Sequence, residues 1–220
     1  MKGTAALCSV CLLTAIGFAG SAQGTSPIAF KSWEVASEFS DTANPAGAWQ
    51  YGYEPTLNDV FSLLPVAEHQ FPAIYGWQRT GDINEGPFIN HNKKNVQKGP
   101  FGSKAIVYPP HSLSLHPGQL CEYADLRFTA PAAGNYRITG QFYAMDYGGQ
   151  TTTDVHVSVN QVEVFAGTVS YSSSPTASFT PSQLLVPLQA NDVIDFQVGC
   201  GSNNNYFSDT TGLNAVIEVE

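Results

Sequence analysis

The chain has 220 residues, with 18 acidic and 9 basic side chains and a formal net charge of −9. This charge, with no basic cluster longer than Lys93-Lys94, excludes a protein that binds nucleic acid through the phosphates. Thirteen Phe, ten Tyr and three Trp with a charged fraction of only 12% exclude a disordered chain. The length suits one all-β domain.

Residues 1–22 are predicted to be a secretory signal peptide. Lys2 gives a positive start, residues 5–19 are almost all apolar, and Gly20-Ser21-Ala22 are small residues of the kind found at a cleavage site. An apolar run of about 15 residues is short for a membrane span, which needs about 20, and this favours a signal peptide over an anchor. We therefore expect a secreted or periplasmic protein whose single domain is residues 23–220, without a transmembrane segment.

Removal of the signal peptide changes the charge and the cysteine count. Eight basic residues remain against 18 acidic ones, a formal charge of −10, and the only cysteines left are Cys121 and Cys200. Because exported proteins fold in an oxidising compartment, a Cys121–Cys200 disulfide is the favoured prediction. The alternative is that both cysteines are buried thiols.

The first half of the mature chain is rich in aromatic residues, with strand candidates near 33–39, 48–53 and 105–108. In the second of these, Trp49, Tyr51 and Tyr53 alternate with Gln50 and Gly52, so the three rings would share one face of a strand. Packing between two sheets is the favoured interpretation, and an exposed aromatic surface is the alternative.

The second half alternates as β-strands do. Residues 136–144 form one such run, 155–159 and 162–165 flank Asn160-Gln161 as a hairpin, and further strands are expected at 184–188, 194–198 and 213–219. Pro187 suits an edge position. Strands without helices between them predict an antiparallel β-sandwich of the jelly-roll type.

Four segments in order carry a resemblance to a known family. They are NPAGAWQYGY at 44–53, LHPG at 115–118, LRFTAPAAGNY at 126–136 and DTTGL at 209–213. The string resembles a family of secreted bacterial β-sandwich domains that often occur in exported proteins with a PEP-CTERM sorting tail, and it spans about residues 30–219. The resemblance implies a jelly roll similar to carbohydrate-binding modules and implies no activity. Because this chain shows no sorting tail, we expect it to be free after export.

Aromatic residues supply the candidate binding site. Planar rings with a polar tip can stack on the apolar faces of sugars while amides bond the hydroxyl groups. The predicted ligand-binding residues are Trp77, Tyr143, Tyr147, Asn90 and Trp49, with Tyr171 and Tyr206 as further ring candidates. A solvated loop is an equally good interpretation of 90–92.

Catalytic and metal motifs are sparse in this sequence. The five histidines lack zinc-site spacing, and no nucleophile elbow, P-loop or dinucleotide motif occurs. We predict no catalytic residue, although a glycosidase would need two facing carboxylates, for which the candidates are Glu54, Asp59, Glu68, Asp82, Glu85, Asp125, Asp146 and Asp154. No cofactor is expected, except that loop oxygens would suit a structural calcium near Asp146 and Asp209.

These observations favour a secreted, non-catalytic protein that binds a glycan or other polysaccharide. The first alternative is a structural component of an extracellular matrix or envelope, and the second is a glycoside hydrolase. The acidic charge disfavours polyanionic glycans as ligands.

Overall fold

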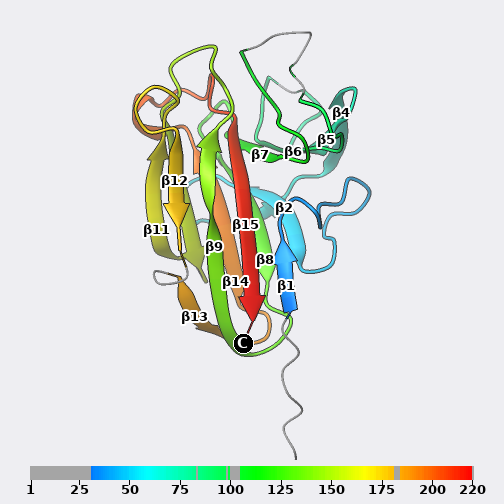
Figure 1. The fold of residues 1–220 in the computed structure, drawn as a ribbon, viewed down its shortest axis with the longest axis vertical. Helices are drawn as coiled ribbons and strands as arrows, with labels where there is room; N and C mark the ends of the chain where they lie inside the picture. The colour runs from blue at the N-terminus through cyan, green and yellow to red at the C-terminus, as the bar shows by residue number, and fades with distance from the viewer. Residues whose placement is uncertain (1–30, 83, 98, 100–104, 181–183, 220) are drawn as a thin grey trace, which may run out of the picture.

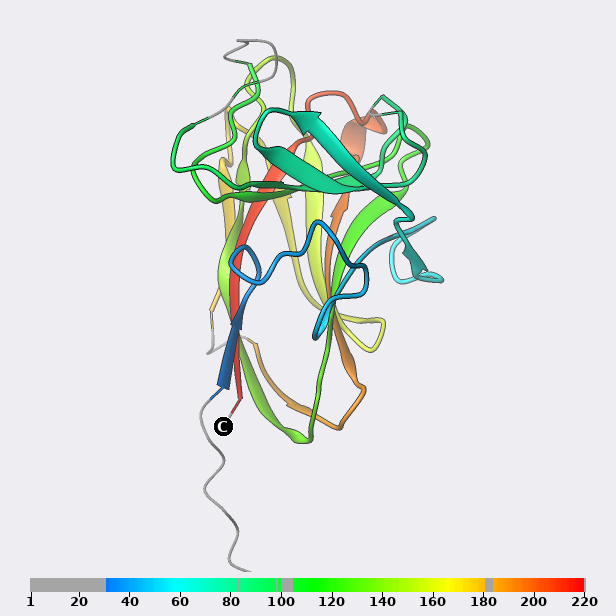
Figure 2. The ribbon, with the colours of Figure 1, turned by 90° about the vertical axis from the view of Figure 1, so that its right-hand side faces the viewer.

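The computed structural model describes residues 31–82, 84–97, 99, 105–180 and 184–219. Two antiparallel sheets pack face to face as a β-sandwich, as the sequence predicts (Figures 1 and 2). The predicted signal peptide, residues 1–22, lies outside the described residues. Within the described ranges, no helix is both long and apolar enough to cross a membrane.

The larger sheet, sheet A, has nine strands. They are β1 (Lys31–Glu34), β4 (Val66–Phe71), β5 (Ile74–Gln78), β6 (Phe88–Asn92), β7 (Leu113–His116), β9 (Gly134–Ala144), β12 (Thr176–Phe179), β13 (Leu185–Leu188) and β15 (Thr211–Val219). Their order is β12-β9-β15-β7-β6-β5-β4, with β1 on β15 and β13 on β9. Figure 1 shows the long β9 and β15 side by side on the viewer's face.

The second sheet, sheet B, has six strands in the order β11-β10-β14-β8-β2-β3. Their bounds are β2 (Trp49–Glu54), β3 (Ser62–Leu63), β8 (Tyr123–Thr129), β10 (Thr153–Val159), β11 (Val162–Val169) and β14 (Val193–Gly199). A single turn of 3-10 helix, Gly201–Asn203, follows β14.

The core fills the space between the sheets and is centred on aromatic rings. Phe128 of β8 lies 5.0 Å from the ring of Trp33, 5.2 Å from Trp49 and 6.0 Å from Tyr136, measured between centroids. Trp49 and Tyr51 are 1% and 0% exposed, which confirms that this strand face packs between the sheets. The same side chains are therefore unavailable to a ligand.

Most strands of the second half lie where alternation predicts them. The predicted hairpin is β10 and β11, and its turn residues Asn160 and Gln161 both have positive φ, as a tight hairpin turn requires. Pro187 lies in the short β13, which pairs with the start of β9. The predicted disulfide is present and joins Cys121 to Cys200 across a Cα–Cα distance of 5.3 Å.

The first half differs from the predictions. The strand expected at 33–39 ends at Glu34, because residues 35–38 turn. Residues 105–108 form isolated bridges instead of a strand, one of them between Ile106 and Asp146. Strands β4 to β7 were not predicted. Every residue of β6 and β7 is buried, since the segment 105–110 covers the outer face of these strands, so burial there shows no alternation.

The two ends of the sandwich differ in what they carry. One end, named here the loop end, holds the connections 145–152, 170–175 and 204–210, which meet where β9 ends and β15 begins. The other, named the terminal end, holds the start of β1 and the finish of β15, where Lys31 pairs with Val219. Of the predicted site residues, Asp146, Tyr147 and Asp209 belong to the loop end.

Candidate functional site

The structure places both predicted tryptophans in the core. Trp49 is 1% exposed and Trp77 is 8% exposed, so the expectation that Trp77 forms an exposed surface is wrong. Trp77 sits in β5 on the inner face of sheet A, where its ring stacks on Tyr51 at 6.3 Å. Its indole N–H donates to the carbonyl oxygen of Ser40 at 2.7 Å, which satisfies the polar atom inside the protein.

Asn90 is also buried, at 0% exposure. It belongs to β6 instead of a solvated loop, because residues 88–92 pair with β5 on one side and β7 on the other. The side chain of Asn90 bonds the hydroxyl of Tyr108, whose segment covers this part of the sheet. Asn90 therefore supports the fold and is not accessible to a sugar in this structure.

Two of the predicted tyrosine candidates meet at the loop end. Tyr147, from the β9–β10 connection, is 49% exposed, and Tyr171, from the β11–β12 connection, is 41% exposed. Their ring centroids are 5.9 Å apart and the rings are inclined at 70°. Tyr143, the last outward residue of β9, is half-buried near Tyr147, with its ring over Gly212 of β15. We call Tyr143, Tyr147 and Tyr171 the tyrosine patch.

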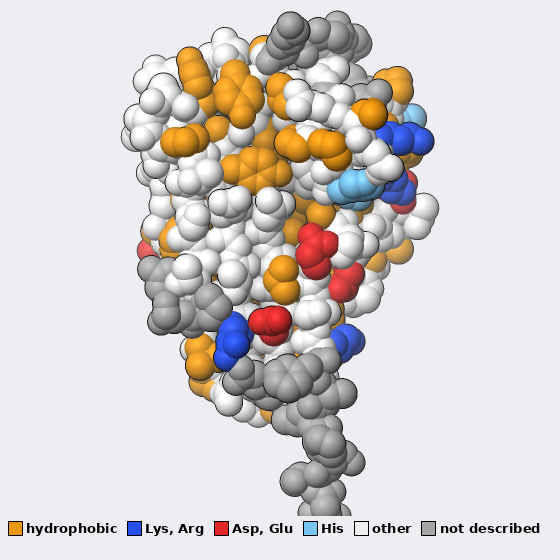
Figure 3. Space-filling model, in the orientation of Figure 1, with side chains coloured by type: hydrophobic (Ala, Val, Ile, Leu, Met, Phe, Trp, Pro, Cys, Tyr) orange, Lys and Arg blue, Asp and Glu red, His pale blue; other side chains and the backbone are white. Residues whose placement is uncertain are grey.

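The surroundings of the tyrosine patch are neutral. From Tyr147 to Thr153 and from Ser170 to Thr180 the sequence holds no charged residue and is rich in Gly, Ser and Thr. Figure 3 shows hydrophobic side chains gathered on the upper part of this face, while charged side chains lie mainly lower down and at the right-hand edge. Two inclined rings with hydroxyl-rich borders can hold a sugar ring against one aromatic face and its edge against the other.

Tyr206, the remaining ring candidate, is half-buried on the 204–210 connection. Its hydroxyl donates to the carbonyl oxygen of Asn84 at 2.9 Å, and its ring lies 4.4 Å from that of Phe207. The structure pairs Tyr206 with Phe207 and His116 and does not pair it with the tyrosine patch.

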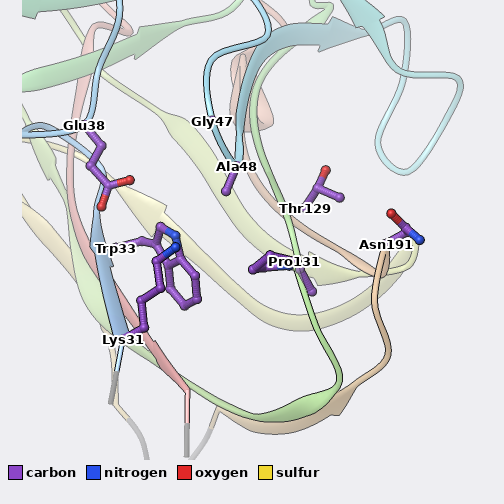
Figure 4. A pocket seen from close by; sticks show the side chains of 9 residues that line it. Lys31, Trp33, Glu38, Gly47, Ala48, Thr129, Pro131 and Asn191 are labelled. Atoms are coloured by element: carbon purple, nitrogen blue, oxygen red, sulfur yellow. The ribbon is translucent and has the colours of Figure 1, made fainter. Parts of the chain in front are cut away.

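A groove of about 560 Å³ lies at the sandwich edge between β1 and the ends of β2 and β8 (Figure 4). Its lining residues are Lys31, Trp33, Glu38, Gly47, Ala48, Thr129, Ala130, Pro131 and Asn191. Trp33 is only 3% exposed, and the Lys31 ammonium sits 4.8 Å from its ring centroid. Because the indole already packs on Lys31, Phe128 and Tyr136, it offers no free face for stacking.

Three carboxylates face one another on the outer face of sheet B. They are Glu54 of β2, Asp125 of β8 and Asp195 of β14, with ligand oxygens all within 4.8 Å of one another. Each is 0% exposed, because the segment 55–61 crosses this face and Phe61 lies over the Arg127 guanidinium at 4.0 Å. A pair of facing carboxylates therefore exists, but buried in this way it has no room for a glycosidic bond.

Part of this carboxylate cluster is predictable from the sequence. Glu54 and Asp125 are among the candidates drawn from the sequence, whereas Asp195 is not. Alternation in β14 puts Asp195 opposite Ile194 and Phe196, on the phase expected to face water. Its burial depends on the segment 55–61, which belongs to a distant part of the chain.

Asp146 and Asp209, the residues near which calcium is predicted, lie together at the loop end. Asp209 accepts hydrogen bonds from the Thr152 backbone N–H and the Thr153 hydroxyl through Oδ1, while Oδ2 is buried without a partner among the described residues. Burial, together with the nearby Asp146 and Asp154 charges, raises the pKa of Asp209 to about 7. Calcium at this position stays a prediction.

His156, on the outer face of β10, lies between two carboxylates. Its Nε2 is 3.1 Å from Asp154 Oδ2 and its Nδ1 is 2.6 Å from Glu163 Oε2. Burial opposes the charge on the imidazole, but the hydrogen bonds to Asp154 and Glu163 outweigh it and hold the pKa of His156 above its usual 6.5. The folded state therefore favours the imidazolium form.

This arrangement predicts a pH-dependent contribution to stability. Because the folded pKa is raised, the contribution of His156 is fully present below about pH 6.5 and is lost as the pH rises through the folded pKa. We expect the difference in unfolding free energy between wild type and His156→Gln to be larger at pH 5.5 than at pH 8.5, measured by urea denaturation. A His69→Gln variant, whose native ring stacks on Tyr75, is the control and should show a smaller trend. A difference that grows with pH would contradict the assignment.

No family model matches the chain, and no curated protein matches it either. The resemblance to the PEP-CTERM-associated family therefore stays a prediction. Solved structures with a similar arrangement include CBM51 from Clostridium perfringens GH95 in complex with methyl-galactose, at 13% identity, covering 72% of this chain and 95% of that one, with a TM-score of 0.36.

Two further solved structures show similar values. A family 35 carbohydrate binding module from Clostridium thermocellum matches at 13% identity over 56% of this chain and 85% of its own, with a TM-score of 0.28. A structure titled "CBM4 structure and function" matches at 14% identity over 66% and 82%, with a TM-score of 0.30. Likeness at this level assigns no ligand to the present chain.

Proposed function

We propose that this protein acts outside the cytoplasm as a non-catalytic protein that binds neutral glycans on the tyrosine patch. The observation that carries the proposal is the contact between Tyr147 and Tyr171, which come from different connections and leave 49% and 41% of their surfaces exposed. Exposed rings held in contact at one end of a rigid sandwich form a binding surface that loses little entropy on binding.

Charge supports neutral sugars over charged ones. The two connections that carry Tyr147 and Tyr171 contain only neutral residues at their surface, and the chain as a whole is acidic, which repels polyanions. The Ser172 and Ser174 hydroxyls and the Gln150 amide border the same connections and supply groups able to bond sugar hydroxyls. The disulfide fits an oxidising, extracellular setting.

Affinity electrophoresis in gels containing single neutral polysaccharides tests the proposal. The probes are β-glucan, galactan, mannan and xylan, followed by titration calorimetry with an oligosaccharide of whichever one retards the protein. Replacing Tyr147 and Tyr171 together by alanine should weaken binding at least tenfold, since truncating a central aromatic contact costs more than about 1.4 kcal/mol.

Matched variants separate stacking from other effects. The double phenylalanine variant keeps both rings and should retain most of the affinity, whereas Tyr75→Ala removes a half-buried tyrosine that stacks on His69 and should change nothing. Unaltered affinity in the double alanine variant would refute the assigned surface. A wild-type protein that none of the four polysaccharides retards, and that self-associates instead, would favour the structural role.

A further inference from the structure

The carboxylate cluster on the outer face of sheet B is not used by the proposed function. Its three members come from neighbouring strands of one sheet, because Gly52 of β2 pairs with Asp125 of β8, and Arg127 of β8 pairs with Asp195 of β14. Glu54 follows Gly52 by two residues and therefore points to the same side. The cluster is thus a fixed product of strand register.

The three carboxylates of the cluster differ in the hydrogen bonds that they accept from protein groups. The Arg127 guanidinium donates to both carboxylate oxygens of Asp195, from Nε to Oδ1 at 2.6 Å and from Nη2 to Oδ2 at 3.0 Å. Glu54 Oε2 accepts from the Gln197 amide at 2.9 Å and from the Asp59 backbone N–H at 3.2 Å, and Oε1 lies 3.4 Å from Arg127 Nη2. Asp195 and Glu54 are therefore held in place by protein groups.

Asp125 differs from both. It is 0% exposed, and neither of its carboxylate oxygens accepts a hydrogen bond from any described residue. Arg127 Nη2 is 4.0 Å from Asp125 Oδ2, beyond hydrogen-bond distance. A buried carboxylate without a donor carries a large desolvation cost, which a bound cation or a proton at this position would remove.

Charge balance identifies the class of that group. Three carboxylates and one guanidinium leave a net formal charge of −2 in a region closed to solvent, and bidentate pairing assigns the Arg127 charge to Asp195. Two positive charges would then neutralise Glu54 and Asp125. Hard divalent cations favour carboxylate oxygens, and Ca²⁺ binds them at about 2.3 to 2.6 Å, so that oxygens on opposite sides lie up to about 5 Å apart. The ligand oxygens of the three carboxylates, which all lie within 4.8 Å of one another, agree with this spacing.

We propose that Glu54, Asp125 and Asp195 bind one divalent cation of the Ca²⁺ type, which links β2, β8 and β14 beneath the segment 55–61. Asp125 and Glu54 supply the neutralising charges, and Asp195 contributes an oxygen while it remains paired with Arg127. The ion holds strands together and takes no part in sugar binding. This site is separate from the loop-end calcium predicted near Asp146 and Asp209.

Metal analysis of the secreted wild-type protein, purified without chelator, is the primary test. We expect at least one equivalent of calcium per chain, and a thermal midpoint that falls by about 5 °C or more in EDTA and recovers with added CaCl₂. A protein that contains no divalent metal and is indifferent to EDTA would overturn the proposal, because protons would then balance the carboxylates.

Three variants locate the ion. Asp125→Asn and Glu54→Gln should each contain one equivalent of calcium less than wild type and lose the response of the thermal midpoint to EDTA that this ion causes, whereas Asp209→Asn, which changes the predicted loop-end site, should keep at least one equivalent and that response. Calcium that is lost from Asp209→Asn and retained by Asp125→Asn would overturn the assignment. If neither cluster variant folds, the metal content of wild type and Asp209→Asn still decides, since at least one equivalent in both supports the cluster and complete loss in Asp209→Asn contradicts it.

Discussion

Replacing Cys121 and Cys200 together by alanine is expected to lower the free energy of unfolding by about 4.5 kcal/mol. The two cysteines are 79 residues apart in sequence, and closing a loop of that length restricts the unfolded chain by about this amount in the chain-entropy model. The bond joins the β7–β8 connection to the residue after β14, so it ties a sheet A strand to the neighbourhood of sheet B.

Urea denaturation of the double variant and of wild type measures this loss. Wild type unfolded in the presence of dithiothreitol is the matched control and should show a similar midpoint to the variant, because both lack the bond. A loss below about 1 kcal/mol would mean that the unfolded chain is already constrained in this region, contrary to the entropy argument.

Phe128→Ala is expected to cost about 3 to 5 kcal/mol of unfolding free energy. Phe128 is fully buried and its ring meets those of Trp33, Trp49 and Tyr136, which come from both sheets. Truncation removes the ring and leaves a cavity that three large, rigid neighbours cannot readily fill. The loss of edge-to-face contacts adds to the cost.

Phe128→Leu serves as the comparison for this variant. Leucine retains much of the buried volume, so the destabilisation should be clearly smaller than that of Phe128→Ala in the same denaturation experiment. Equal costs for the two variants would show that the specific aromatic contacts, and not the cavity, dominate at this position.

Sequence patterning predicts this fold well where one face of a strand meets water and the other meets the core. β9 and β15 show that arrangement and lie where alternation places them. The pattern fails for β6 and β7, which are buried on both faces, because buried Asn and His side chains there resemble those of a polar loop. The disulfide follows from the cysteine count once the predicted signal peptide, residues 1–22, is set aside.

The candidate site is less accessible to sequence reasoning because it depends on contacts between distant segments. Tyr147 is a ring candidate from composition, but its contact with Tyr171 requires two connections to meet at the loop end. Trp77 is also a ring candidate from the sequence, but its side chain is buried, because β5 lies between β4 and β6 in sheet A. The burial of Asp195 likewise depends on a segment from the other half of the chain.

The pairing of β1 with β15 has a practical consequence for how the molecule can be attached to a support. Lys31 and Val219 lie together at the terminal end, while Tyr147 and Tyr171 lie at the loop end, the length of β9 away (Figure 1). A tag fused before Lys31 or after Val219 would attach the domain to the support by its terminal end, with Tyr147 and Tyr171 directed away from the support. Immobilised arrays of oriented protein could then capture soluble glycans without the tether shielding the rings.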